Sequence, residues 1–155
     1  MALTTEFVKV AQSGPTIDGR KIDPNQLKQM AANYDKSVYT AVVFPGHDHN
    51  WSAYGTVESV EARDEGNAVV GLYAKIAPNA FWQSDIRYGQ NVFTSIEITP
   101  NFAGTGEAYL TGLGATNNPA SLGVAQLNFS VADKLYSDAY QTVFIEEPQP
   151  KPSFF

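Results

Sequence analysis

The sequence predicts an α+β domain built mainly from antiparallel strands, with a few α-helices flanking a β-barrel. The 155 residues suit one domain, and 43% of them are hydrophobic, which is ordinary globular composition. Most segments rich in β-branched and aromatic residues are short and end at turn-forming residues. Helical patterns are few and do not alternate regularly with the strands, so a parallel α/β fold is disfavoured. An open antiparallel sheet and a closed barrel both fit this pattern.

The first third of the chain predicts a strand and a helix. Residues 6–12 form a strand that stops at Gly14-Pro15, and a tight Asp-Gly turn follows. Asp23 is a suitable N-cap and Pro24 suits the first helical position. A single apolar stripe then recurs at helical spacing, formed by Leu27, Met30, Ala31 and Tyr34.

The middle of the chain predicts three strands and a short helix. Residues 38–44 have the composition of a buried strand, and residues 55–62 and 67–76 that of a hairpin. Asn79 is placed to cap a short helix through Ile86. We expect Phe81 and Trp82 to anchor this helix in the core.

The last third predicts two more strands, a helical turn and a tail. Residues 92–98 alternate, so Ser95 shares one face with Phe93 and Glu97, opposite the core-facing residues. Residues 107–115 form the next strand, and Asn118-Pro119 can start a final helical turn. The acidic, proline-rich tail, residues 146–155, is typical of an extended linker rather than core.

Charge and composition disfavour several function classes. The net charge of −6, with ten scattered basic residues, argues against nucleic acid or an anionic membrane as partner. No apolar run is long enough to span a bilayer, and the N-terminus lacks the features of a signal peptide. The absence of cysteine removes disulfides, thiolate metal sites and cysteine nucleophiles. Only His47 and His49 can supply an imidazole base.

Titratable residues gather directly after the strand predicted at residues 38–44. Here Asp48 lies between the two histidines, at a place where functional loops are common. An ordinary surface loop and a metal site through His47 and His49 are both compatible with the pattern. A zinc site, however, needs a third ligand and a supporting shell, for which the sequence offers no later acidic cluster.

A long motif resembles the GPO-type bacteriophage capsid scaffolding proteins, which carry an N-terminal serine protease domain. The strongest stretch runs from Val92-Phe93-Thr94-Ser95-Ile96-Glu97-Ile98 through Thr99-Pro100-Asn101-Phe102-Ala103 to Pro119-Ala120-Ser121-Leu122-Gly123. Weaker agreement at Ile17-Asp18-Gly19-Arg20, Val38-Tyr39 and Ala74-Lys75-Ile76-Ala77-Pro78 extends it over about residues 5–130. The resemblance implies a fold similar to that of herpesvirus assemblin and other prohead proteases.

The resemblance also implies the catalytic residues. Ser95 matches the nucleophile, His47 the general base and Asp18 the third member of the triad, while Asp48 and His49 remain rivals for that third role. One departure is that the family's usual Glu-His pair is Gly46-His47 here. Glu97 we interpret as structural. The oxyanion donors are expected on a glycine-containing strand, at Gly112 and Gly114.

By this resemblance, residues 1–145 form a serine endopeptidase that uses no cofactor and no metal, and residues 146–155 lead toward a scaffolding region missing from this sequence. Its substrates are its own scaffold segment and the major capsid and portal proteins of the procapsid. It acts as a homo-oligomer, with a dimer as one possible form, in the host bacterial cytoplasm inside the assembling procapsid. The alternative is a catalytically inactive scaffold or capsid-binding module.

Overall fold

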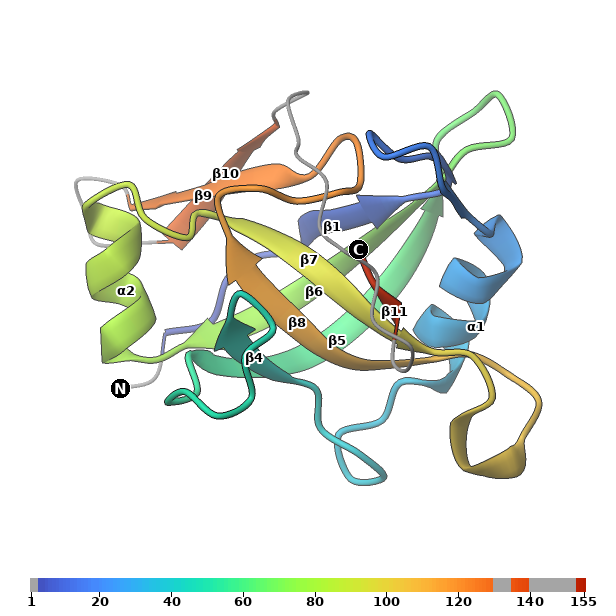
Figure 1. Ribbon diagram of the computed structural model, residues 1–155, viewed down its shortest axis with the longest axis horizontal. Coiled ribbons are helices and arrows are strands. Elements are labelled where there is room, and N and C mark those ends of the chain that lie inside the picture. Colours follow the sequence, from blue (N-terminus) through green and yellow to red (C-terminus); the bar gives the residue numbers. More distant parts are fainter. Residues whose placement is uncertain (1–2, 130–134, 140–152) are drawn as a thin grey trace.

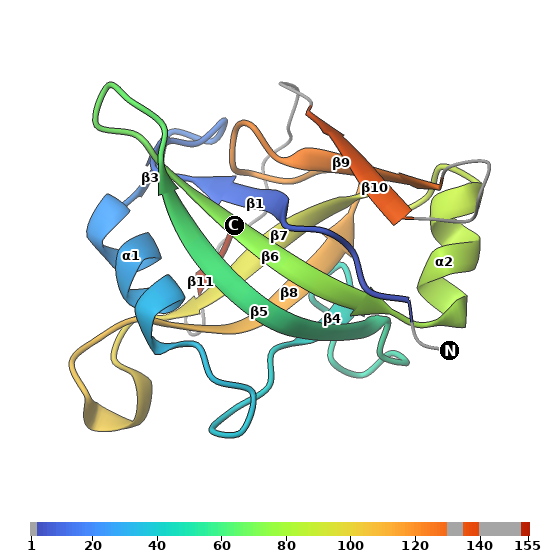
Figure 2. The same ribbon diagram turned by 180° about the vertical axis from the view of Figure 1, so that it is seen from behind.

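The computed structural model describes residues 3–129, 135–139 and 153–155, and it is mostly β. Its main sheet has seven strands and curls into a half-barrel (Figures 1 and 2). In spatial order they are β1 (Val8–Gln12), β6 (Val70–Pro78), β5 (Gly55–Asp64), β4 (Val42–Pro45), β8 (Tyr109–Thr116), β7 (Phe93–Thr99) and β11 (Ser153–Phe154). Neighbouring strands are antiparallel except β4 and β8, which run parallel. Because β1 and β11 end this order, the sheet is curled but not closed.

Two small sheets accompany the main one. In the first, β2 (Gly14–Pro15) pairs with β3 (Lys21–Ile22). In the second, β9 (Ala125–Phe129) pairs with β10 (Leu135–Ala139). The helical turn expected at Asn118-Pro119 is wrong, because turns and bends there lead directly into β9.

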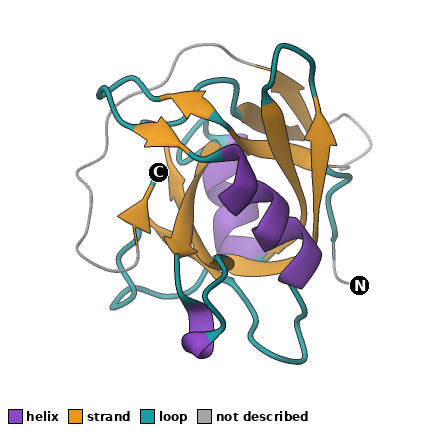
Figure 3. Ribbon diagram, turned by 90° about the vertical axis from the view of Figure 1, so that its right-hand side faces the viewer, coloured by secondary structure: helices purple, strands orange, loops and turns teal. Residues whose placement is uncertain are grey.

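Two α-helices lie at opposite ends of the half-barrel, and seen from the side the strands curve around them (Figure 3). Helix α1 (Pro24–Asn33) is capped by the Asp23 carboxylate, which accepts from the Asn25 N–H at 2.8 Å, as the sequence predicts. Helix α2 (Ala80–Arg87) is capped by Asn79 in the same way. A 3₁₀ turn, η1 (Phe102–Gly104), precedes β8.

Two expectations about apolar residues are wrong. On α2, Trp82 is fully buried but Phe81 is 69% exposed, because adjacent helical residues point about 100° apart and only one can face the core. The strand expected from residue 38 begins only at Val42. The N–H groups of Val38 and Tyr39 both donate to the Asp35 carbonyl, which forms a turn and leaves these two side chains largely exposed.

The end of the chain packs against the sheet. Residues 146–152 of the expected linker lie outside the described residues, whereas Ser153–Phe155 lies beside β7. Phe155 belongs to the hydrophobic core. Phe154 and Phe155, at the end of the proline-rich tail, are thus buried, because the segment pairs with the edge of β7.

The two faces of β7 are both buried. Ile96 and Ile98 join the hydrophobic core on one face, as the alternation predicts. Ser95 and Glu97, on the other face, are also fully buried. A buried carboxylate needs partners from elsewhere in the chain, and the loop after β4 provides them for Glu97.

Candidate active site

A strained turn presents His47 to the sheet. Gly46 and His47 have φ values of 57° and 64°, and the Asp48 N–H donates to the Pro45 carbonyl at 3.0 Å. Two central residues with positive φ are the feature of a type I′ turn, which suits Gly46 but disfavours a histidine. Strain of this kind persists when the surroundings hold the residue in place, and it is frequent at functional sites.

The His47 ring occupies the space above Gly114. A Cβ atom placed on Gly114 would lie 2.6–2.7 Å from the His47 Cε1, Nδ1 and Nε2 atoms, so the ring lies directly on the bare backbone. Gly114 pairs with Ser95 across the antiparallel β7–β8 ladder. Side chains of directly opposed residues leave the sheet on the same face, so the His47 ring lies next to Ser95.

Glu97 joins His47 from the same strand as Ser95. Its Oε2 lies 2.8 Å from His47 Nδ1, and the carboxylate is completely buried. Glu97 sits opposite Gly112, and a Cβ there would lie 2.6 Å from Glu97 Oε1. The two glycines of β8 thus leave room for the imidazole and the carboxylate, side by side. His47 and Glu97 are connected like the base and acid of a catalytic triad, and Ser95 lies on the same face of β7 as Glu97.

The second histidine shares the same carboxylate. His49 Nε2 lies 3.0 Å from Glu97 Oε1, and the His49 ring stacks on Phe44 with 4.6 Å between ring centroids. Half of the His49 side chain remains exposed, whereas that of His47 is 4% exposed. Glu97 therefore lies between the two imidazoles, the inner one next to Ser95 and the outer one at the surface.

The Ser95 hydroxyl is buried and its Oγ has no hydrogen-bond partner among the described residues. A buried polar atom left unpaired costs about 1–3 kcal/mol, and most native structures avoid it. Such an atom is consistent with a reactive group that gains its partners when substrate arrives.

Comparison with known proteins identifies the family of the chain. Residues 5–132 match the family described as GPO serine peptidase, N-terminal domain. The chain belongs to the GPO serine peptidase family. It is also 37% identical over 136 residues to the capsid assembly scaffolding protein of Escherichia phage P2, which covers 81% of this chain and 48% of that protein. The chain therefore spans about half the length of this curated relative.

No solved structure matches the chain. The assemblin-like arrangement expected from the resemblance thus stays a prediction, while the curled, mainly antiparallel sheet with two helices is compatible with the expected fold class.

The residue expected as third member of the GPO peptidase triad has other partners. Asp18 accepts hydrogen bonds from the Thr16 hydroxyl and, at 2.7 Å, from the Arg20 Nε–H. Burial raises the pKa of Asp18, but these hydrogen bonds and the Arg20 charge more than offset it, so the pKa lies below its ordinary value. Within the part of the chain that the structure describes, Asp18 bonds to these neighbours in its own turn and to neither histidine.

The remaining candidates also lie in defined surroundings. Asp48, the other rival for the third role, is exposed and accepts from the Asn50 N–H in its own loop at 3.0 Å. Gly112 and Gly114 lie inside β8, which is paired on both sides, so their peptide groups lie in the plane of the sheet. Their visible role is to make space, and the oxyanion assignment stays a prediction.

Sequence reasoning placed Glu97 on the Ser95 face but interpreted it as structural, and so missed its contacts with both histidines. The signal was present, because residues two apart on a strand share a face, and Glu97 is two residues after Ser95. What the sequence could not show is that the loop carrying both histidines folds over that face.

The described residues contain no group of three or more His, Asp or Glu side chains suited to a metal ion. No helix among them is long and apolar enough to cross a membrane.

Proposed function

We propose that this chain is a serine endopeptidase in which Ser95 is the nucleophile, His47 the general base and Glu97 the residue that orients His47. The observation that carries the proposal is the position of the His47 ring: over Gly114, opposite Ser95, with Nδ1 on the buried Glu97 carboxylate. In this proposal Glu97 takes the third role in place of Asp18, whose carboxylate is engaged by Thr16 and Arg20.

The proposed reaction is acyl transfer in two halves. Because Nδ1 faces Glu97, Nε2 is the nitrogen of His47 that takes the proton from Ser95 as Oγ forms a bond to the scissile carbonyl carbon. The C–N bond then breaks, and His47 returns this proton to the leaving amine. Water attacks the acyl-enzyme in the same way, which releases the new carboxylate and restores the Ser95 hydroxyl.

Glu97 has two tasks in this scheme. It accepts the Nδ1–H of His47, which fixes the tautomer with its lone pair on Nε2, and it stabilises the imidazolium that forms during each half-reaction. The low polarity around a buried carboxylate strengthens both effects. His49, on the outer side of Glu97, holds the carboxylate in place.

The proposed substrates follow from the motif resemblance, and the name of the relative supports a role in capsid assembly. The phage P2 protein is named a capsid assembly scaffolding protein. By analogy, this chain cleaves its own scaffold segment and the major capsid and portal proteins inside an assembling procapsid in the host cytoplasm, acting there as a homo-oligomer. Its protease domain covers residues 1–145.

A second candidate is a catalytically inactive scaffold or capsid-binding module. The observation that favours it is the burial of Ser95, which is 0% exposed and therefore closed to substrate in this conformation. The two candidates differ in whether Ser95 reacts at all.

A fluorophosphonate probe separates them, because it bonds to a serine oxygen only where a base removes the proton. We expect an adduct on Ser95, mapped by mass spectrometry, in the unaltered chain or in Phe154→Ala, which uncovers His47. Ser95→Ala and His47→Ala should abolish it.

The matched control is Thr94→Val, since Thr94 is the adjacent residue and its hydroxyl is also buried without a partner among the described residues. This variant should label like its parent. Labelling that persists in Ser95→Ala contradicts the nucleophile assignment, and no Ser95 adduct in either parent chain supports the inactive module.

A further inference from the structure

The end of the chain lies on the edge of the strand that carries Ser95. Ser153 pairs with Ile98 and Phe154 with Glu97 in antiparallel register. The Phe155 N–H then donates to the Ile96 carbonyl at 2.7 Å. By this register a following residue would lie opposite Ser95. Addition of a strand to a sheet edge is a common way to bind an extended peptide.

The two aromatic side chains of this segment enter different surroundings. The Phe154 ring stacks on the His47 ring, with 4.2 Å between centroids and 9° between planes. Phe155 points to the opposite face and joins the core. Both are less than one-tenth exposed. Phe154 therefore lies on the Ser95 face of β7, and the backbone of the segment pairs with the adjoining strand edge.

Arg20 clamps the segment from the side. Its Nη1 donates to the Phe154 carbonyl at 3.2 Å, and its guanidinium lies 4.6 Å from the centre of the Phe155 ring. The Asp18 carboxylate holds the Arg20 Nε–H at 2.7 Å, and Thr16 donates to the same carboxylate. This gives the Asp-Gly-Arg turn a role: Asp18 orients Arg20 toward the peptide backbone.

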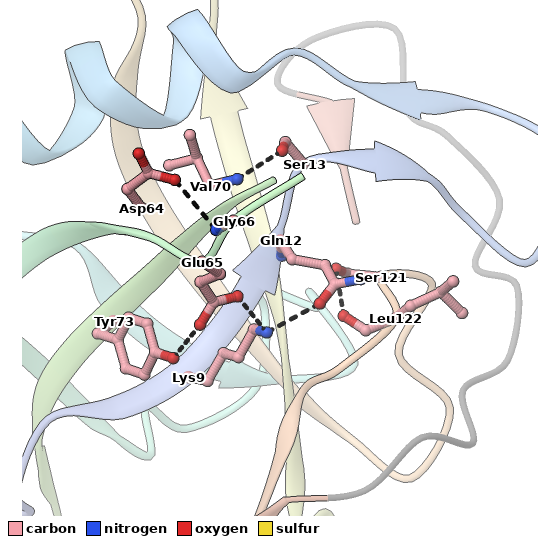
Figure 4. Close-up of polar contacts among 10 residues, drawn as sticks. All are labelled: Lys9, Gln12, Ser13, Asp64, Glu65, Gly66, Val70, Tyr73, Ser121 and Leu122. Atoms are coloured by element: carbon pink, nitrogen blue, oxygen red, sulfur yellow. Dashed lines mark hydrogen bonds and ion pairs between the residues drawn. The ribbon is translucent and has the colours of Figure 1, made fainter. Parts of the chain in front are cut away.

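A third contact comes from the loop before β9. The Ser121 N–H donates to the Phe155 carbonyl oxygen at 3.4 Å. The Ser121 hydroxyl in turn accepts from the Gln12 N–H at 3.0 Å and donates to the Leu122 carbonyl (Figure 4). Figure 4 also shows Lys9 between Gln12 and Glu65, which ties this corner to the β5–β6 hairpin. Ser121 is thus held with its N–H directed at the segment.

We propose that the outer edge of β7 is a peptide-binding edge for an extended segment with two consecutive aromatic residues, and that Ser153–Phe155 occupies it as an intramolecular ligand. Arg20 and the Ser121 N–H are its backbone-binding groups, and Asp18 is a positioning residue that acts through Arg20. The proposal deepens the proposed function and rests on it for one consequence: a substrate in this register has the carbonyl at the Phe155 position beside Ser95, with the Ser121 N–H as its donor.

The binding test uses full-length chains carrying Ser95→Ala, so that its outcome does not depend on catalysis. The probe is a fluorescent peptide with the sequence of residues 149–155, and its binding is measured by fluorescence anisotropy. A tethered segment competes at an effective concentration on the order of millimolar. We therefore expect the peptide to bind the Phe154→Ala/Phe155→Ala chain at least tenfold more tightly than the chain with its own segment intact.

Variants of the clamp test its parts. We call the Phe154→Ala/Phe155→Ala chain the released chain. Adding Arg20→Ala to it should weaken peptide binding at least tenfold, and adding Asp18→Asn should weaken binding less. The matched control is Arg63→Ala, because Arg63 also lies over aromatic rings and pairs with a neighbouring carboxylate, but on β5. The Arg63→Ala control should bind the peptide unchanged. A peptide with alanine in place of both phenylalanines should not bind.

A second measurement covers a released chain that fails to fold. In the Ser95→Ala chain with its segment intact, nuclear Overhauser contacts should connect the Phe154 and His47 rings. Their absence overturns the proposal, as does equal peptide binding by the intact and released chains or no effect of Arg20→Ala. Peptide binding without any Ser95 adduct in the labelling experiment supports the peptide-binding edge and contradicts the proposed protease activity.

Discussion

A buried glutamate between two imidazoles is the central residue-level feature of this protein. A carboxylate is costly to bury without partners, and Glu97 satisfies that need with both histidines of the chain. The His47 backbone is held in a left-handed conformation that brings its ring onto Gly114. The burial of the Glu97 carboxylate and the positive φ of His47 are each unfavourable on their own. The contact between the two residues compensates, as is typical of functional sites.

Replacing Glu97 by glutamine tests its orienting role. The amide keeps the shape but loses the charge and can present a donor to Nδ1, which favours the wrong tautomer of His47. We expect turnover of a peptide substrate to fall about 10²–10⁴-fold with little change in KM. The signature is loss of the low-field Nδ1–H proton resonance of His47 in the NMR spectrum. Restoration of that resonance and of part of the turnover in Glu97→Asp would separate orientation from folding.

Asp18→Asn tests the competing assignment, in which Asp18 rather than Glu97 orients His47. If Glu97 orients His47 and Asp18 acts on the peptide through Arg20, the asparagine variant should raise KM more than it lowers kcat. A loss confined to kcat, as large as that of Glu97→Gln, would return Asp18 to the role that the family resemblance implies.

At the level of elements, the pair β7 and β8 builds the site from complementary residues. Ser95 and Glu97 project from β7, and Gly114 and Gly112 face them from β8. Cross-strand partners without side chains create a shallow channel, into which the loop after β4 inserts His47. Strand β11 then covers this channel from the other edge of β7.

Filling this channel should inactivate the protein. An alanine Cβ at position 114 would lie 2.6 Å from His47 Cε1, so the ring must move. A shift of about 1 Å at a catalytic group can cost about 100-fold in rate, and we expect at least that loss of probe labelling for Gly114→Ala.

Gly71→Ala is the matched control for the channel. Its Cβ would meet the Glu65 carboxylate at 2.7 Å, an equal crowding in another strand of the same sheet. Labelling should be retained there. Equal losses in both variants, or normal labelling of Gly114→Ala, would contradict the position given to His47.

At the scale of the whole molecule, ion pairs tie distant segments of the half-barrel together. Lys9 pairs with Glu65 and Lys36 with Glu58, at 2.6 and 2.7 Å. Hydrogen bonds from Lys36 and Thr56 hold the pKa of Glu58 below its ordinary value. Burial raises the pKa of Glu65, but hydrogen bonds from Lys9 and Tyr73 more than offset this effect, so the pKa of Glu65 is also lowered. Together with Asp18, these carboxyls couple folding to pH.

The sign of this coupling follows from the lowered pKa values. A carboxyl whose pKa is lower in the folded state contributes stability above its ordinary value, and that contribution is lost as pH falls through the folded value. The urea concentration at the midpoint of unfolding should therefore decrease as the pH is lowered below about 4.5, the ordinary pKa of glutamate.

Asp18→Asn isolates one of these contributions. Its midpoint should be lower than that of the parent at pH 7, and the difference should shrink below pH 3.8, the ordinary value for aspartate. A difference that is constant with pH would show that the Asp18 charge does not contribute.

Local signals in the sequence were sufficient for much of the fold. Asp23 and Asn79 cap their helices, the β5–β6 hairpin forms around its turn, and β7 places Ser95 and Glu97 on one face. These features depend on neighbours a few residues away, so periodicity and capping chemistry reveal them. The motif resemblance pointed to Ser95 and His47 and to the GPO serine peptidase family, which the family match confirms.

Only the tertiary structure decided which groups meet at the site. Glu97 lies 50 residues from His47 in the sequence, and Phe154 reaches the same ring from the far end of the chain. Asp18 turns instead to Arg20. The Asp18–Arg20 contact is local, but no local pattern encodes the contacts of Glu97 and Phe154 with His47, because they arise when β7 pairs with β8 on one edge and β11 on the other. The sequence by itself predicted Ser95 as nucleophile and His47 as base, and long-range strand pairing decided what surrounds and covers these two residues.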